Sequence, residues 1–74
     1  ITILIVDDHA HFRLQARALL EADGFVVVGE AGDGASGLRA ARALRPDLVL
    51  LDIGLPDIDG FEVARDLATD GPPP

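Results

Sequence analysis

The sequence predicts an α/β fold in which helices cover both faces of a parallel sheet. Three short apolar segments, residues 1–6, 25–31 and 48–51, alternate with three segments of helical periodicity. This alternation is typical of right-handed βαβ crossovers, which place successive strands parallel. Because the strand segments are apolar at most positions, both faces of the sheet should be buried.

The first helix is expected between the first two strands. Its apolar positions recur at helical spacing: Phe12, Ala16, Leu19 and Leu20. Gly24 follows the last turn, where glycine adopts a left-handed conformation at little cost. The helix should therefore end just before Gly24, and the chain should then enter the second strand.

The second and third helices carry N-terminal capping signals. Asp33 is a predicted N-cap, and Asp59 with Glu62 forms a predicted capping box. The helix after Asp33 should run through Leu44. Leu38, Ala41 and Leu44 should lie on one side of the second helix, and the third should bury a stripe of Phe61, Ala64, Leu67 and Ala68. The sequence DGPPP at 70–74 should end the third helix, since proline lacks the backbone N–H that a helix needs.

Composition excludes several classes of function. The 74 residues carry a net charge of −7 without any lysine, which disfavours direct nucleic-acid binding. There is no cysteine for a disulfide or a thiolate metal site. No apolar run approaches the roughly 18 residues of a membrane span, and no signal peptide is visible. These features favour a cytoplasmic protein without a membrane segment.

The predicted sheet is incomplete. Three strands would leave the apolar segment 48–51 at an edge, where unpaired backbone groups favour association. We therefore expect residues 1–74 to be the N-terminal part of a single larger domain. Self-association or exchange of strands with another copy is the alternative way to complete the sheet.

Acidic residues follow two of the predicted strands. Asp7 and Asp8 end the first strand, and Asp52 ends the third. In open α/β sheets, ligands bind beyond the carboxyl ends of the strands. If the two strands are neighbours, three carboxylates converge there and favour a bound cation. Oxygen ligands select Mg²⁺ or Mn²⁺, and Mg²⁺ commonly binds a phosphoryl group as well.

Other interpretations of these residues remain open. Taken one at a time, Asp7 and Asp8 are better explained as residues of a helix start, and Asp52 as a turn residue. GDGASG at Gly32–Gly37 matches the G-x-G-x-x-G pattern of dinucleotide-binding domains, although a tight strand-to-helix turn explains the same glycines. His9 and His11 are close to the acids, which makes a metal role conceivable, but the expectation is that they are surface residues at a helix entrance. Asp57 is expected to be a solvated loop residue.

Three stretches together resemble the receiver domain of bacterial two-component response regulators. They are ILIVDDH, VVGEAGDGASGL and PDLVLLDIGLPDIDGFEVARDL, which together cover most of the chain. The resemblance implies a flavodoxin-like, doubly wound sheet of strand order 2-1-3-4-5, truncated here after the third strand–helix unit. DDHAHFR is most similar to the subgroup with a C-terminal LuxR-type helix-turn-helix. That subgroup would place a DNA-binding domain elsewhere in the parent protein.

The resemblance also implies roles for four residues. Asp52 would be the phosphoacceptor, receiving a phosphoryl group from a sensor histidine kinase. Asp7, Asp8, Asp52 and the backbone carbonyl of Gly54 would hold Mg²⁺. The protein would be a regulatory phosphoacceptor that assists its own phosphotransfer and switches an output, most typically transcription. It would not be an enzyme acting on a separate substrate.

One part of the family pattern lies outside this sequence. The switch hydroxyl and the lysine of the family follow its fourth and fifth strands, which residues 1–74 do not include. An interaction module that works without phosphorylation is therefore the alternative function, and a dinucleotide-binding domain using Gly32–Gly37 is a further one.

Overall fold

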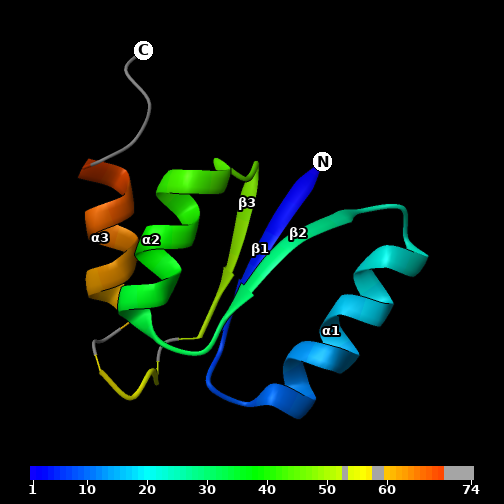
Figure 1. Cartoon of the computed structure of the whole chain (residues 1–74), viewed down its shortest axis with the longest axis horizontal. Helices are drawn as coiled ribbons and strands as arrows, with labels where there is room; N and C mark the ends of the chain where they lie inside the picture. Colours follow the sequence, from blue (N-terminus) through cyan, green and yellow to red (C-terminus); the bar gives the residue numbers. More distant parts are fainter. Residues whose placement is uncertain (53, 58–59, 70–74) are drawn as a thin grey trace.

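Strands and helices alternate along the whole described chain (Figure 1). The computed structural model describes residues 1–52, 54–57 and 60–69. The elements are β1 (Thr2–Val6), α1 (Ala10–Ala22), β2 (Val26–Ala31), α2 (Gly34–Leu44), β3 (Leu48–Leu51) and α3 (Gly60–Thr69). Both strand pairs are parallel, and the order is β2-β1-β3. The predicted fold class is confirmed. The predictions for Asp59 and for residues 70–74 lie outside the described residues.

Strand β1 forms the centre of the core. Its side chains alternate between the two faces of the sheet, as a strand requires. Leu4 and Val6 join the cluster formed with α2 and α3, whereas Ile3 and Ile5 join the cluster formed with α1. Figure 1 shows α1 on one side of the sheet and α2 with α3 on the other. The central strand is therefore buried on both faces, as its apolar sequence predicted.

The end of α1 confirms the prediction made for Gly24. Gly24 has a φ of 91°, in the left-handed region that favours glycine. Its N–H donates to the carbonyl of Glu21, and the N–H of Phe25 donates to the carbonyl of Leu20, both at 3.0 Å. These two bonds form the glycine-terminated cap that closes many helices. They turn the chain from α1 into β2.

The start of α2 is also as predicted. The side chain of Asp33 accepts the backbone N–H of Ser36 at 2.7 Å, which makes Asp33 the N-cap. One turn later Gly37 is buried against Val6 of β1. A Cβ on Gly37 would lie 2.8 Å from Cγ1 of Val6. This glycine therefore allows α2 to approach the sheet closely.

Two predicted apolar faces need correction. In α1 the side chains of Phe12 and Leu19 are 45% and 72% exposed, and only Ala16 and Leu20 pack against the sheet. In α3 it is Val63 that is fully buried, with Leu67 beside it, while two predicted core residues are exposed, namely Ala64 and Ala68. Burying valine removes more apolar surface from water than burying alanine, so α3 turns its larger side chains inward. The side chain of Phe61 lies outside the described part.

Strand β3 lies at an edge of the described sheet and is less buried than predicted. Leu48 and Leu50 are 53% and 41% exposed. They border an apolar groove of about 250 Å³, lined by Ile3, Leu20, Phe25, Leu48, Val49 and Leu50. The edge position expected for this strand is thus observed, whereas burial on both of its faces is not.

Asp47 links β1 and β3 at the end of the sheet where both strands begin. Asp47 precedes β3, and its Oδ2 accepts the N–H of Thr2 at 2.7 Å and the hydroxyl of Thr2 at 3.1 Å. These hydrogen bonds, the backbone one foremost, lower the pKa of Asp47.

No described helix is long and apolar enough to cross a membrane.

The stabilisation from Asp47 should depend on pH. A carboxyl with a lowered pKa in the folded state stabilises fully above its unfolded value and progressively less as pH falls through the folded value. The free energy of unfolding, measured in urea, should therefore differ most near pH 7 between the full-length protein and its Asp47→Asn variant. The difference should shrink toward pH 3, and a constant difference over that range would contradict the assignment.

Candidate metal and phosphoacceptor site

The backbone of the sheet positions the acidic residues. The N–H of Asp7 donates to the carbonyl of Ala31 at 3.0 Å, and the N–H of Asp52 donates to the carbonyl of Val6 at 2.9 Å. Each bond extends a strand ladder by one residue beyond the strand itself. Asp7 and Asp52 are therefore held at adjacent strand ends, at the carboxyl edge of the sheet.

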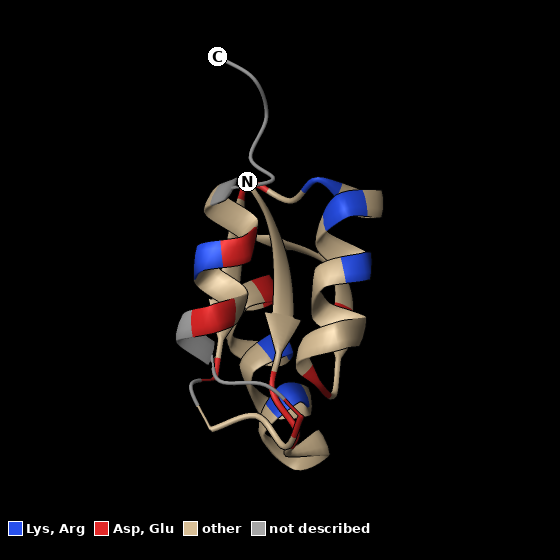
Figure 2. Cartoon of the chain, turned by 90° about the vertical axis from the view of Figure 1, so that its left-hand side faces the viewer, with Lys and Arg blue, Asp and Glu red and all other residues tan. Residues whose placement is uncertain are grey.

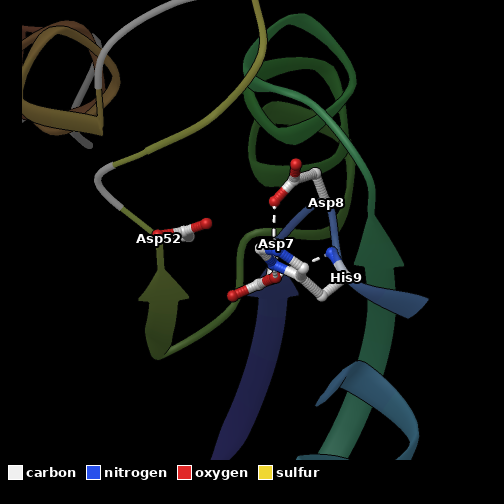
Figure 3. A group of neighbouring side chains, drawn as sticks. All are labelled: Asp7, Asp8, His9 and Asp52. Atoms are coloured by element: carbon white, nitrogen blue, oxygen red, sulfur yellow. Dashed lines mark hydrogen bonds and ion pairs between the residues drawn. The ribbon is translucent and has the colours of Figure 1, made fainter. Parts of the chain in front are cut away.

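Four side chains meet at this edge (Figure 3). Asp7, Asp8, His9 and Asp52 each offer one ligand atom, and these atoms all lie within 4.8 Å of one another. Asp7 is buried, Asp52 is half-buried and Asp8 faces solvent more openly. The predicted convergence of the three aspartates is therefore present in the structure.

His9 lies beside the acids at the start of α1. It is the N-cap of α1, and its side chain is 71% exposed, which agrees with a surface residue at a helix entrance. However, its Nδ1 is 2.9 Å from Oδ1 of Asp7 and 3.0 Å from Oδ1 of Asp8. The hydrogen bond with Asp7, and then the charge of Asp8, raise the pKa of His9. His11 is exposed and is not one of the four clustered side chains.

The donor set fits a hard divalent cation. Three carboxylates and one imidazole surround the same point, and oxygen ligands predominate. Gly54 adjoins the group, since its N–H donates to Oδ1 of Asp52 at 3.1 Å. A Cβ on Gly54 would lie 3.8 Å from that oxygen, an ordinary contact. The position therefore does not require glycine, which agrees with a role confined to its backbone.

Arg13 is a residue of the site that the helical pattern missed. Its Nη1 donates to the carbonyl of Asp7, and its Nε donates to Oε1 of Glu30 at 3.1 Å. Arg17 donates to the other oxygen of Glu30 at 2.8 Å. Glu30, next to the last residue of β2, is therefore paired with arginines and does not join the acidic group. The sequence feature that could have indicated this role is the position of Arg13 at the end of DDHAHFR, six residues after Asp7.

The glycine-rich segment is occupied by the protein's own carboxylates. Asp57 accepts the N–H groups of Gly34 and Ala35 at 2.7 and 3.0 Å, and Asp33 accepts that of Ser36. A pyrophosphate would need these same N–H groups. The dinucleotide interpretation is therefore disfavoured. Asp57 is an exposed loop residue, as predicted, but its carboxylate also binds the first turn of α2, which the sequence did not indicate.

Charge is distributed unevenly over the molecule. In Figure 2 one group of acidic positions lies just beyond the tip of the strand, with basic positions close by and further acidic positions elsewhere, and the basic positions of α2 lie toward the far end of that helix. Arg39, Arg42 and Arg45 are exposed. The carboxyl edge of the sheet is therefore the face that attracts cations.

Comparisons with known proteins agree with this geometry. The family model described as response regulator receiver domain matches residues 3–74. A putative transcriptional regulator of Pseudomonas aeruginosa is 59% identical over 61 residues, which are 82% of this chain and 30% of that protein. The virulence regulator BvgA of Bordetella pertussis is 48% identical over 71 residues, which are 96% of this chain and 34% of BvgA.

A solved structure shows the same fold. The LuxR-family two-component response regulator from Aurantimonas sp. SI85-9A1 superposes with a TM-score of 0.87 at 38% identity, over 92% of this chain and 49% of that chain. The present chain thus spans about a third of the relatives it matches and about half of this solved chain. Since the family model covers nearly all of its residues, the chain belongs to the response regulator receiver domain family.

Proposed function

We propose that the chain is a phosphoacceptor domain that receives a phosphoryl group on Asp52. The observation that carries this proposal is the convergence of Asp7, Asp8 and Asp52 within 4.8 Å at adjacent strand ends. Asp7 and Asp8 follow one strand, and Asp52 follows its neighbour. This arrangement suits a cation shared between protein carboxylates and a phosphoryl group.

The proposed reaction is nucleophilic attack by a carboxylate oxygen of Asp52 on phosphorus. The donor is a phosphohistidine of a sensor histidine kinase. The new O–P bond forms as the N–P bond breaks, and the histidine leaves with its nitrogen lone pair. Asp7, Asp8, Asp52 and the carbonyl of Gly54 would hold Mg²⁺, whose positive charge would offset the negative charge of the phosphoryl oxygens. Mn²⁺ is suited to the same ligands.

The residues of the chain contribute position and charge. The ladder bond from Asp52 to Val6 fixes the nucleophile at the strand end, and the Gly54 N–H orients its carboxylate. Arg13 holds the backbone at Asp7 through its carbonyl. The aspartyl phosphate product adds negative charge to the site, and such a change can bias a two-state element elsewhere in the domain.

We further propose that the output is transcription. The two relatives described above carry names of transcription regulators, and the solved neighbour is named as LuxR family. A DNA-binding domain in the parent protein and a cytoplasmic location would follow from that assignment. The switch hydroxyl and lysine of the family would be supplied by parts of the domain outside residues 1–74.

Intact-mass analysis tests the proposal. The full-length protein is incubated with a small-molecule phosphodonor with and without Mg²⁺. We expect one phosphoryl adduct that requires Mg²⁺ and disappears in Asp52→Asn. An adduct that persists in Asp52→Asn, or the absence of any adduct in the wild type, would overturn it and favour an interaction module that works without phosphorylation.

A further inference from the structure

The carboxylate of Asp57 joins two segments that are far apart in sequence. Its Oδ1 accepts the N–H of Gly34 at 2.7 Å, and its Oδ2 accepts the N–H of Ala35 at 3.0 Å. The contact spans 23 residues along the chain. Both oxygens of one side chain are therefore committed to the first turn of α2.

These bonds complete the N-terminus of α2. The first N–H groups of a helix have no partner within the helix. Here Asp57 binds the first two, and the side chain of Asp33 binds the third, that of Ser36. The next N–H, of Gly37, already donates to the carbonyl of Asp33 at 3.0 Å. Two carboxylates thus share one helix end, but only Asp33 is adjacent to α2 in the sequence.

The same contact anchors the segment that follows the phosphoacceptor. Asp52 is fixed at its start by the ladder bond to Val6. Leu55 is buried in the core cluster with Leu4 and Val63. Asp57 then ties the segment to the first turn of α2. Gly54, whose carbonyl the proposed function assigns to the cation, lies between Asp52 and these two anchors.

We propose that Asp57 is a positioning residue for the metal site, which fixes the Gly54 backbone by tethering its loop to α2. This inference rests on the proposed function. Mg²⁺ demands near-octahedral geometry with short metal–oxygen distances, so a loop carbonyl serves as a ligand only if it is held in place. Leu55 restrains the loop through non-directional apolar contact, whereas the two hydrogen bonds of Asp57 fix its orientation.

The test compares Asp57→Ala with Asp33→Ala in the full-length protein. Each variant removes one negative charge and one cap from the same helix end, but only the first releases the loop. Mg²⁺ binding is measured by titration calorimetry. We expect Asp57→Ala to weaken Mg²⁺ binding about tenfold, as for residues that orient metal ligands. Asp33→Ala should leave the affinity within about twofold, although both variants should lower the denaturation midpoint.

A second measurement needs no metal. Hydrogen exchange at the Gly54 amide in the metal-free protein should be faster in Asp57→Ala and unchanged in Asp33→Ala. If Asp57→Ala does not fold, Asp57→Asn takes its place, because one amide oxygen can still accept one of the two N–H groups. That variant should give the same changes to a smaller extent.

The outcomes separate this inference from the proposed function. Equal changes in the two variants, or no change at Gly54, would mean that Asp57 only caps α2 and would overturn the inference. A wild type that binds no Mg²⁺ would overturn the proposed function and the part of the inference that assigns Asp57 to the metal site. In that case the exchange rate at Gly54 would still decide whether Asp57 tethers the loop.

Discussion

Replacing Asp8 by asparagine should weaken Mg²⁺ binding by about a hundredfold or more. Residues that merely orient metal ligands already contribute roughly 10- to 100-fold to affinity, and Asp8 is assigned as a ligand itself. Its carboxylate belongs to the group whose ligand atoms lie within 4.8 Å of one another. Phosphoryl transfer to Asp52 should fall with the loss of the cation.

The same substitution should stabilise the metal-free protein. Asp7, Asp8 and Asp52 bring three negative charges together, and the exposed His9 bridges only two of them, Asp7 and Asp8. Two charges 4 Å apart interact by roughly 1 kcal/mol in water, so removing one charge should raise the free energy of unfolding by about that amount. Function would thus be maintained at a cost in stability, as is common at active sites.

Both effects are measurable on one pair of proteins. Calorimetric titration gives the Mg²⁺ affinity, and urea unfolding in a chelator gives the stability of the metal-free state. Asp23→Asn is the control for net charge, since Asp23 caps the far end of α1. An Asp8→Asn variant that binds Mg²⁺ as tightly as Asp23→Asn would contradict the assignment of Asp8.

Adding one methyl group at Gly37 should destabilise the protein by up to about 2 kcal/mol. The new Cβ would lie 2.8 Å from Cγ1 and 3.0 Å from Cγ2 of Val6, which is fully buried. Overpacking a core typically costs about 1–3 kcal/mol, partly offset by the roughly 1 kcal/mol that alanine gains over glycine in a helix. Valine has little rotamer freedom, so the strand or helix must shift.

Gly29 offers a matched control. A Cβ on Gly29 would come equally close to a neighbour, at 2.9 Å from Cδ1 of Leu44. Leu44 is 46% exposed, and its side chain can rotate away. Gly29→Ala should therefore change the free energy of unfolding by less than about 0.5 kcal/mol or stabilise slightly, since glycine is unfavourable within a strand.

Urea unfolding of the two glycine variants distinguishes packing from conformation. A lower midpoint with an unchanged m-value is expected for Gly37→Ala alone. Equal losses in both variants would mean that backbone conformation, and not the contact with Val6, requires glycine at residue 37. The prediction also bears on the G-x-G-x-x-G pattern, because it explains the last glycine without a bound nucleotide.

Local interactions explain why much of the fold could be predicted. The apolar segments became the strands, Asp33 capped α2, and Gly24 ended α1 with a positive φ. Each of these outcomes depends on neighbours within a few residues, which a sequence shows directly. The buried faces of α1 and α3 were harder to predict from the sequence. Helical spacing identifies candidate faces, but the choice between Ala64 and Val63 depends on what packs opposite.

The sequence by itself determined the strand–helix alternation and the aspartates at two strand ends. Only the tertiary structure decided which carboxylates meet. Asp7, Asp8 and Asp52 converge because β1 lies beside β3, while Glu30 is drawn to Arg13 and Arg17. Asp57 gained its partners from α2, 22 and 23 residues earlier. Such contacts depend on the relative placement of whole elements, which local patterns do not contain.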